Sequence, residues 1–169
     1  AIDLGADIVV APNEIKRAVR RMTKSRAISL STDAGNVDRL TGGSDVVIDC
    51  VGSSESITDA LSVTRPRGKI VLVGMPSVVN LELTPLWHRE IQLVGAYTYG
   101  TETLMDGSNA RTFDLAIDLV ESAKLDRLVS AIYPLNRYQD ALEHAASAGR
   151  RGAVKVAFDL RSEKERDLL

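Results

Sequence analysis

The chain has 169 residues, 44% of them hydrophobic and only 4% aromatic, so we expect an aliphatic core in one domain, or in one domain plus part of another. Its formal net charge of −2 does not suggest a nucleic-acid or anionic-membrane partner. Cys50 is the single cysteine, which excludes an intramolecular disulfide and a cysteine-based metal cage and fits a cytoplasmic location. No apolar run approaches the roughly 20 residues of a membrane-spanning helix.

The first forty residues carry short, local signals. A β-branched run predicts a strand over Asp7–Ala11, and apolar residues at helical spacing predict a helix over Glu14–Met22. Ala27–Ser31 is a further strand candidate, and Asp33–Leu40 is a weak helix candidate.

Three apolar runs follow, and each ends at a glycine: Asp45–Gly52, Lys69–Gly74 and Ile91–Gly95. A buried parallel strand has this continuous Val/Ile/Leu composition, because helices cover both faces of its sheet. Glycine at the carboxyl end of such a strand lets bare backbone come close to a ligand, at the edge where open α/β sheets bind ligands. Between the first two runs, Ser53 or Ser54 is the expected cap of a helix that reaches Thr64, followed by a tight turn over residues 65–68.

The rest of the chain alternates loops, helices and strands. We predict a polar loop over Gly100–Asn109, a helix over Arg111–Ala123, a strand over Leu128–Tyr133, a helix from Tyr138 to Ala145, a turn over Gly149–Gly152 and a strand over Ala153–Leu160. The alternation is typical of a parallel sheet wound by helices.

Motifs for self-contained catalysis are missing. The sequence has neither the phosphate-binding GxxxxGK[ST] loop nor the dinucleotide fingerprint GxGxxG. His88 and His144 have no second imidazole or carboxylate at metal-ligand spacing, so we expect both to be structural or exposed. Asp49, inside an apolar strand, is either a general base or a carboxylate satisfied by nearby backbone N–H groups, and we favour the second interpretation.

Two further side chains have open interpretations. Cys50 has no basic neighbour in sequence, so a small buried hydrophobic role is favoured over a reactive thiol. Lys155 alternates with Val154, Val156 and Phe158, which places it on the opposite face of its strand. That face either meets solvent or receives a phosphate group.

Taken in order, seven segments resemble the carboxyl-terminal half of the zinc-type alcohol dehydrogenase family, in the medium-chain dehydrogenase/reductase superfamily. They are LGADIVV, GGSDVVIDCVGSSESITDAL, RPRGKIVLVGMP, REIQLVGAYTYG, RTFDLAIDLVESAKL, YPLNRYQDALEHA and GAVKVAFDL. The resemblance implies an α/β fold, a partial Rossmann domain whose doubly wound parallel sheet has strands 3–6 of the order 3-2-1-4-5-6. Those strands would be Asp7–Val10, Val46–Val51, Ile70–Val73 and Ile91–Val94. Residues 1–127 would belong to this domain, residues 128–160 would return to the catalytic domain, and residues 161–169 would form a charged tail.

The resemblance also implies a cofactor, NAD or NADP, at the strand ends. The residues it assigns are Cys50, Val51, Gly52 and Ser53 after strand 4, Val73, Gly74 and Met75 after strand 5, Ala96, Tyr97 and Thr98 after strand 6, and Lys155 near the pyrophosphate. In this family the catalytic zinc ligands, the proton relay and the GxGxxG turn come before the point at which this chain starts. We therefore expect a longer parent protein that holds zinc, and no catalytic or metal-binding residue in this chain.

The leading hypothesis is the cofactor-binding portion of an NAD(P)-dependent, zinc-containing alcohol or polyol dehydrogenase, inactive alone, whose parent takes a small alcohol or carbonyl substrate. Two alternatives are a non-enzymatic Rossmann-like interaction module and a zinc-independent quinone reductase of the same superfamily. Because strand 4 would lack its neighbour, we expect a homo-oligomer formed through exposed sheet edges. The substrate and the choice between NAD and NADP stay open.

Overall fold

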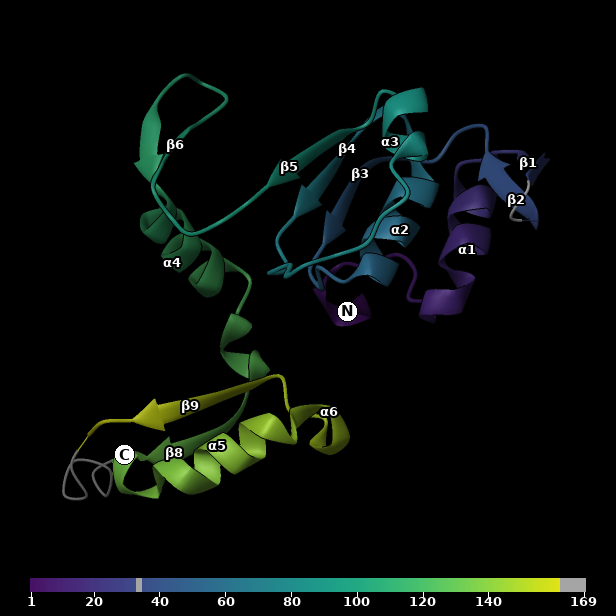
Figure 1. The fold of residues 1–169 in the computed structure, drawn as a ribbon. Coiled ribbons are helices and arrows are strands. Elements are labelled where there is room, and N and C mark those ends of the chain that lie inside the picture. Colours follow the sequence, from purple (N-terminus) through teal and green to yellow (C-terminus); the bar gives the residue numbers. More distant parts are fainter. Residues whose placement is uncertain (33–34, 162–169) are drawn as a thin grey trace. The chain divides into compact units, whose positions relative to one another are not determined.

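The computed structural model describes residues 1–32 and 35–161 and divides the chain into two units, Ala1–Thr98 and Tyr99–Leu169. In the first unit, strands β3 (Ser44–Asp49), β4 (Thr64–Leu72) and β5 (Gln92–Gly95) lie side by side in that order, and both pairs are parallel (Figure 1). The three glycine-ended runs therefore form a short parallel sheet, as predicted.

Helix α2 (Ser54–Val63) joins β3 to β4 and packs on both strands. The apolar side chains of α2, Ile57, Ala60 and Leu61, recur at helical spacing and share one face of the helix. In the core they form one buried cluster with Ile70 of β4 and Ile91, which precedes β5. Partly buried residues complete this core: Val47, Leu72, Val79, Leu81 and Leu86.

The two faces of this sheet differ in the first unit. Helix α1 (Ile15–Met22) packs on α2, and α3 (Thr84–His88) also contacts α2, so these helices lie on one side. Side chains alternate along a strand, and Val46, Ile48 and Val94 on the other face are exposed. A helical layer over that second face stays a prediction.

The strand predicted over Asp7–Ala11 is wrong. This segment connects the 3-10 turns η1 (Ile2–Leu4) and η2 (Pro12–Glu14) and pairs with no described strand. Its Ile8 and Val9 side chains are exposed. A β-branched run forms a strand only where a neighbour accepts its hydrogen bonds, and here none is in place.

The helix predicted over Asp33–Leu40 is also wrong in its described part, while residues 33 and 34 lie outside the described residues. Strand β2 (Gly35–Leu40) pairs antiparallel with β1 (Ala27–Thr32), which confirms the strand candidate at Ala27–Ser31. The helical signal was weak, and cross-strand pairing over six residue pairs overrides it. The expected helix at Glu14–Met22 is confirmed as α1.

The predicted turn over residues 65–68 lies inside β4, which continues through it with a shift in pairing register. Arg67 has a positive φ of 58°, so the local bend exists but is absorbed as a strand irregularity.

In the second unit, the predicted polar loop at Gly100–Asn109 is largely a hairpin of β6 (Thr101–Thr103) and β7 (Asn109–Arg111). Its turn is closed by Asp106, whose Oδ1 accepts hydrogen bonds from the backbone N–H and the hydroxyl of Ser108 at 2.9 and 2.6 Å. Gly107 takes the positive φ of 83° that such a turn requires.

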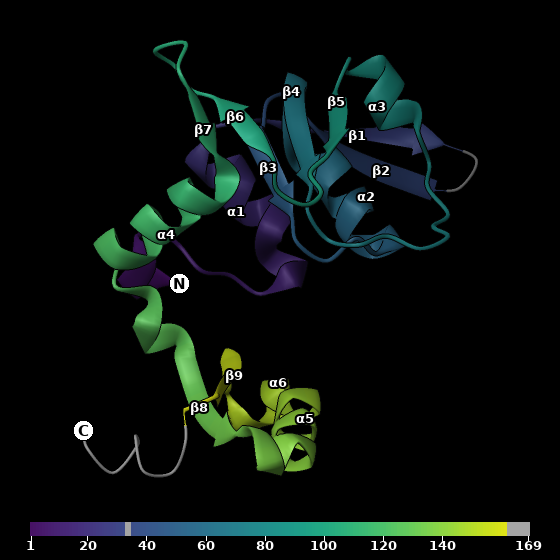
Figure 2. The same cartoon turned by 90° about the vertical axis from the view of Figure 1, so that its left-hand side faces the viewer.

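The predicted helix after this hairpin is confirmed as α4 (Thr112–Ser122). Strands β8 (Val129–Pro134) and β9 (Lys155–Asp159) then form a parallel pair, and α5 (Tyr138–Ala146) packs on both (Figure 2). The connecting turns are η3 (Leu125–Leu128) and η4 (Leu135–Arg137), and a short helix α6 (Ala148–Arg151) stands where a plain turn was predicted. In the described part of the chain no helix has the length and apolarity to cross a membrane.

Candidate functional site

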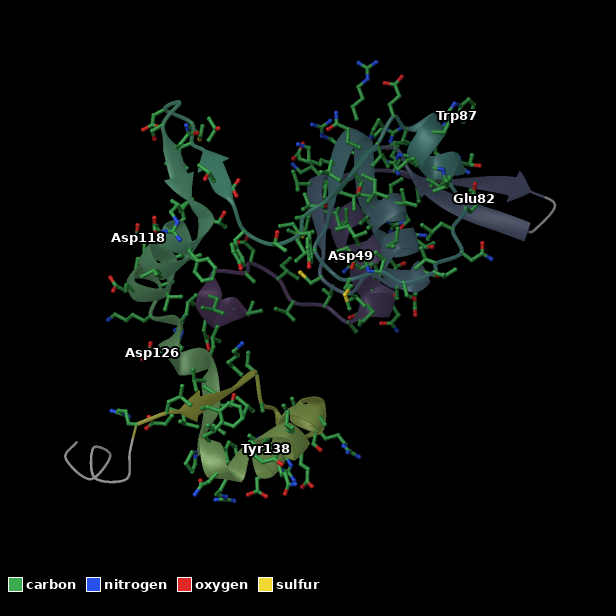
Figure 3. The ribbon with its side chains drawn as sticks, turned by 60° about the vertical axis from the view of Figure 1, so that its left-hand side comes forward. Asp49, Glu82, Trp87, Asp118, Asp126 and Tyr138 are labelled. Atoms are coloured by element: carbon green, nitrogen blue, oxygen red, sulfur yellow. The ribbon has the colours of Figure 1, made fainter. Side chains whose placement is uncertain are left out.

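The parallel strands β3, β4 and β5 all end at one edge of their sheet, and Asp49 lies at that edge (Figure 3). Asp49 is the last residue of β3 and is only 5% exposed. Its Oδ1 accepts from the backbone N–H groups of Val51 at 2.8 Å and Gly52 at 3.1 Å, and its Oδ2 accepts from the Ser56 hydroxyl at 2.9 Å. The expectation of a carboxylate satisfied by nearby backbone is confirmed, and both oxygens are engaged in holding the loop.

The backbone of Asp49 also ties neighbouring strands together. Its carbonyl oxygen accepts from the N–H groups of Val73 at 2.8 Å and Gly74 at 2.9 Å. One strand further on, the Ala96 N–H donates to the Leu72 carbonyl at 2.9 Å. The N–H groups nearest the strand ends are thus used within the fold.

Gly52 and Gly74 let the loops after β3 and β4 pack backbone against backbone. A Cβ on Gly74 would stand 2.4 Å from the Val51 carbonyl carbon and 2.6 Å from the Gly52 nitrogen. Gly52 has a φ of +78°, and a Cβ there would lie 3.0 Å from the Gly74 carbonyl. Gly95, by contrast, has open space where its Cβ would be. The close approach that two of these glycines permit is therefore to each other.

The side chains around these glycines are apolar and face outward. Val51 and Val73 are 67% and 51% exposed, and Met75 and Tyr97 are 90% and 91% exposed. Cys50 is exposed as well, so the buried role predicted for it is wrong. It follows buried Asp49 directly, and alternation along an extended chain turns its side chain to the opposite side.

A cavity of about 380 Å³ lies beside β3 at this edge. Cys50 and Val51, both predicted site residues, line it together with α2 residues such as Asp59. Its other wall is the segment Val10–Pro12 with Ile15, which the sequence reasoning did not assign to a site. The signal was present, because Asp7–Ala11 is a fourth apolar run that stops abruptly, at Pro12.

The remaining predicted residues have separate positions. Ser53 caps α2: its hydroxyl accepts from the Ser56 N–H at 3.0 Å, and the Ser56 hydroxyl accepts in return from the Ser53 N–H at 3.0 Å. Ala96, Tyr97 and Thr98 follow β5, and Thr98 has a positive φ of 61°. Lys155 is the first residue of β9 in the second unit, where its side chain is exposed. Its place near a pyrophosphate stays a prediction.

The histidines behave as expected. His88 is exposed, and the Nδ1 of His144 lies 3.0 Å from the Tyr133 hydroxyl, a structural contact. Within residues 1–32 and 35–161, no group of three or more His, Cys, Asp or Glu side chains could hold a metal ion. These residues therefore do not fit a zinc site.

Comparison with known proteins gives a consistent result. Residues 1–122 match a family described as zinc-binding dehydrogenase. The chain is 30% identical over 163 residues to L-idonate 5-dehydrogenase from Vitis vinifera, covering 95% of this chain and 39% of that protein. It is 32% identical over 119 residues to sorbitol dehydrogenase from Arabidopsis thaliana, covering 69% and 30%. The chain thus spans well under half the length of these relatives.

Solved structures show the same partial likeness. L-idonate 5-dehydrogenase from Escherichia coli matches with a TM-score of 0.55 and 27% identity, over 69% of this chain and 31% of that one. An alcohol dehydrogenase from Thermus sp. ATN1 matches with a TM-score of 0.61 and 22% identity, over 95% of this chain and 40% of that one. The second match bears on the fold alone.

Proposed function

The chain belongs to the zinc-binding dehydrogenase family, and on this premise we propose that its carboxyl sheet edge is the nicotinamide-side wall of an NAD(P) site in an alcohol or polyol dehydrogenase. The polyol class is suggested by relatives that carry the names sorbitol dehydrogenase and L-idonate 5-dehydrogenase. In this proposal β3, β4 and β5 are strands 4, 5 and 6 of a Rossmann sheet.

The observation that supports this best is that exposed apolar side chains lie beside four backbone N–H groups that already donate within the fold. Val51, Val73 and Met75 offer apolar surface to the face of a planar ring. Because the N–H groups of Val51, Gly52, Val73 and Gly74 already donate within the fold, these four residues can offer a ligand their carbonyl oxygens but not their N–H groups. A carboxamide NH₂ is a donor, so it is the complementary group.

The chemistry divides between the cofactor and this chain. When bound, the nicotinamide supplies hydride exchange with an alcohol carbon. The part of this chain is to hold the wall rigid through Asp49, to orient the carboxamide by backbone carbonyls and to exclude water with the valine side chains. No proton transfer or metal step is assigned to its residues.

Saturation-transfer NMR with NADH tests this wall directly on the 169-residue chain. We expect protons of the nicotinamide ring to receive more saturation than those of adenine. The substitution Val73→Asp, at a half-exposed position of the wall, should abolish the difference because it places a charge against the ring. Val154→Asp is the matched control, since Val154 is also exposed but lies in the second unit. Equal effects of the two variants would contradict the proposal.

The free edge of β3 supports a second function, association through strand pairing. In the described part of the chain β3 has a single neighbour, β4, and its Val46 and Ile48 side chains are exposed. We propose that this edge pairs with a strand of a second copy. Sedimentation velocity should show that the 169-residue chain forms a dimer and that the substitution Val46→Lys converts this dimer to a monomer. If the unsubstituted 169-residue chain were monomeric at all concentrations, the proposed strand pairing would be contradicted.

A further inference from the structure

A second cavity lies away from the sheet edge that carries the cofactor proposal. It has a volume of about 130 Å³ and is enclosed by residues from α1, β2, α2 and the segment around α3. Its lining residues are Lys16, Arg39, Thr58, Leu61, Ser62, Glu82, Pro85 and Arg89. Three of these are cations and one is an anion, which leaves two positive charges around a small space.

Arg89 is the fixed member of this set. Arg89 is 5% exposed. Its Nη2 donates to the Gly42 carbonyl at 2.6 Å, and its Nη1 donates to the Ser62 carbonyl at 3.3 Å. Neutral carbonyls thus hold the guanidinium in place without neutralising it. Burial, followed by repulsion from the Arg39 charge, lowers the pKa of Arg89.

The other charges of the cavity are not paired with each other. Among residues 1–29 and 39–161, whose side chains the structure describes, no salt bridge joins Lys16, Arg39 or Arg89 to a carboxylate. Glu82 (Figure 3) uses its Oε1 to accept from the Thr84 N–H at 2.9 Å, which ties it to the chain that enters α3. Two arginines near each other, one of them buried, are stabilised when an anion lies between them.

We propose that this cavity binds a small tetrahedral oxyanion of the phosphate type. Arg39 and Arg89 supply planar N–H donors, and Lys16 adds a third charge. The two excess positive charges match the two negative charges of hydrogen phosphate. A single water needs on the order of 10–15 Å³, so the space suffices for four oxygens. Leu61 and Pro85 form apolar walls, which strengthens charge pairing by excluding solvent.

The test is isothermal titration calorimetry, in which inorganic phosphate is added to the 169-residue chain at constant ionic strength. We expect saturable binding that Arg39→Gln weakens about tenfold, because it removes a charge-assisted donor pair. Glu82→Gln should tighten binding, because it removes the one repelling carboxylate. Arg21→Gln is the control: Arg21 is exposed on the same helix as Lys16 but does not line the cavity.

Two results would overturn the proposal. One is the absence of saturable phosphate binding in a chain whose circular dichroism shows it to be folded. The other is an equal loss in Arg39→Gln and Arg21→Gln, which would mean that the charge of the whole surface attracts the ion. Neither result bears on NADH binding at the opposite end of α2, so this inference fails or stands separately from the proposed function.

Discussion

The two ends of α2 are held by opposite charges, and each is suited to the backbone groups it meets. At its start, the Asp49 carboxylate accepts from two backbone N–H groups and from the Ser56 hydroxyl. At its end, the Arg89 guanidinium donates to the Ser62 carbonyl in the last turn and to the Gly42 carbonyl. A helix leaves carbonyls unpaired at its end, and Arg89 binds one of them, that of Ser62. At the start, Asp49 binds N–H groups of the loop that precedes α2, and the Ser53 hydroxyl accepts from the helix N–H group of Ser56.

The two ends of α2 differ in the charge that remains available to a ligand once the contacts within the fold are made. Both carboxylate oxygens of Asp49 accept hydrogen bonds within the fold, and the surface beside Asp49 is apolar. Arg89 keeps an uncancelled charge that faces a small cavity. The first end is therefore suited to the face of a ring and the second to an oxyanion, although both are built from one buried ion and surrounding backbone.

The largest effect should come from Gly74→Ala, which tests how tightly the carboxyl edge is packed. The new Cβ would stand 2.4 to 2.6 Å from backbone atoms of Val51 and Gly52, and those atoms cannot move without breaking the Asp49 contacts. We expect a loss of about 3 kcal/mol in the free energy of unfolding. Urea titration followed by far-UV circular dichroism measures it.

Gly95→Ala is the control for this loss. It adds the same methyl group at the end of β5, where nothing lies within 4 Å, and should leave the unfolding midpoint almost unchanged. If both variants were equally stable, the backbone packing at the carboxyl edge would not be as close as described.

Asp49→Ala should be the next most destabilising change, costing about 2 kcal/mol. It leaves two N–H groups without their acceptor, that of Gly52 in a buried position and that of Val51 in a partly buried one. Hydrogen exchange should speed up at these two amides before it does so elsewhere in the sheet. Unchanged protection there would contradict the role given to the carboxylate.

Asp106 offers a surface counterpart of the same local pattern. Its Oδ1 also accepts an N–H two residues ahead, from Ser108, but the turn is exposed and water can replace the bond. Asp106→Ala should therefore not shift the unfolding midpoint measurably. Hydrogen bonds from Ser108 lower the pKa of Asp106, so the stabilisation from this turn, too small to shift the midpoint measurably, is present above about pH 4 and is lost as pH falls through the lowered pKa.

The sequence predicted the carboxyl edge better than the opposite end, and the reason is the range of the interactions. Asp49 finds its partners within seven residues, and a carboxylate near a strand end was enough to predict the backbone N–H partners, although not the Ser56 hydroxyl. Arg89 reaches carbonyls 27 and 47 residues away, and nothing in its neighbourhood indicates where α2 ends. Its role could be seen only once the chain was folded.

The same distinction between local and long-range interactions explains which secondary-structure predictions were wrong. Helix α2 has a clear helical period, β3 and β5 are continuous apolar runs, and all three were predicted to within a few residues. Strand β4 begins at Thr64, before the predicted run at Lys69, because its pairing with β3 continues across the predicted turn. Asp7–Ala11 has strand composition but pairs with no strand in the described part of the chain, whereas Gly35–Leu40 has a partner strand that its own composition did not indicate. Alternation fixes the face on which Cys50 lies, but whether another element covers that face is non-local, and in the described structure Cys50 is exposed.

Arg89→Met tests the basic end and should cost about 1 to 2 kcal/mol, less than the loss at Asp49. Methionine keeps the buried stem of the side chain but cannot donate to the Gly42 and Ser62 carbonyls. In Arg67→Met, an exposed arginine that pairs with Glu90 at the surface is replaced instead, and no shift is expected. If the two variants had equal thermal midpoints, the claim that buried Arg89 stabilises the fold more than exposed Arg67 would be contradicted.

A small effect of opposite sign should come from Arg39→Gln in phosphate-free buffer. Removing the Arg39 charge relieves its repulsion of the Arg89 guanidinium, so the chain should gain on the order of 0.5 kcal/mol of stability at low salt. The gain should shrink at about 1 M salt, where the screening length is about 3 Å. In phosphate the order should reverse, because the unsubstituted chain then gains stability from the bound ion. A variant that is less stable at low salt without phosphate would mean that Arg39 stabilises the fold, and the uncancelled charge inferred for this end of α2 would be wrong.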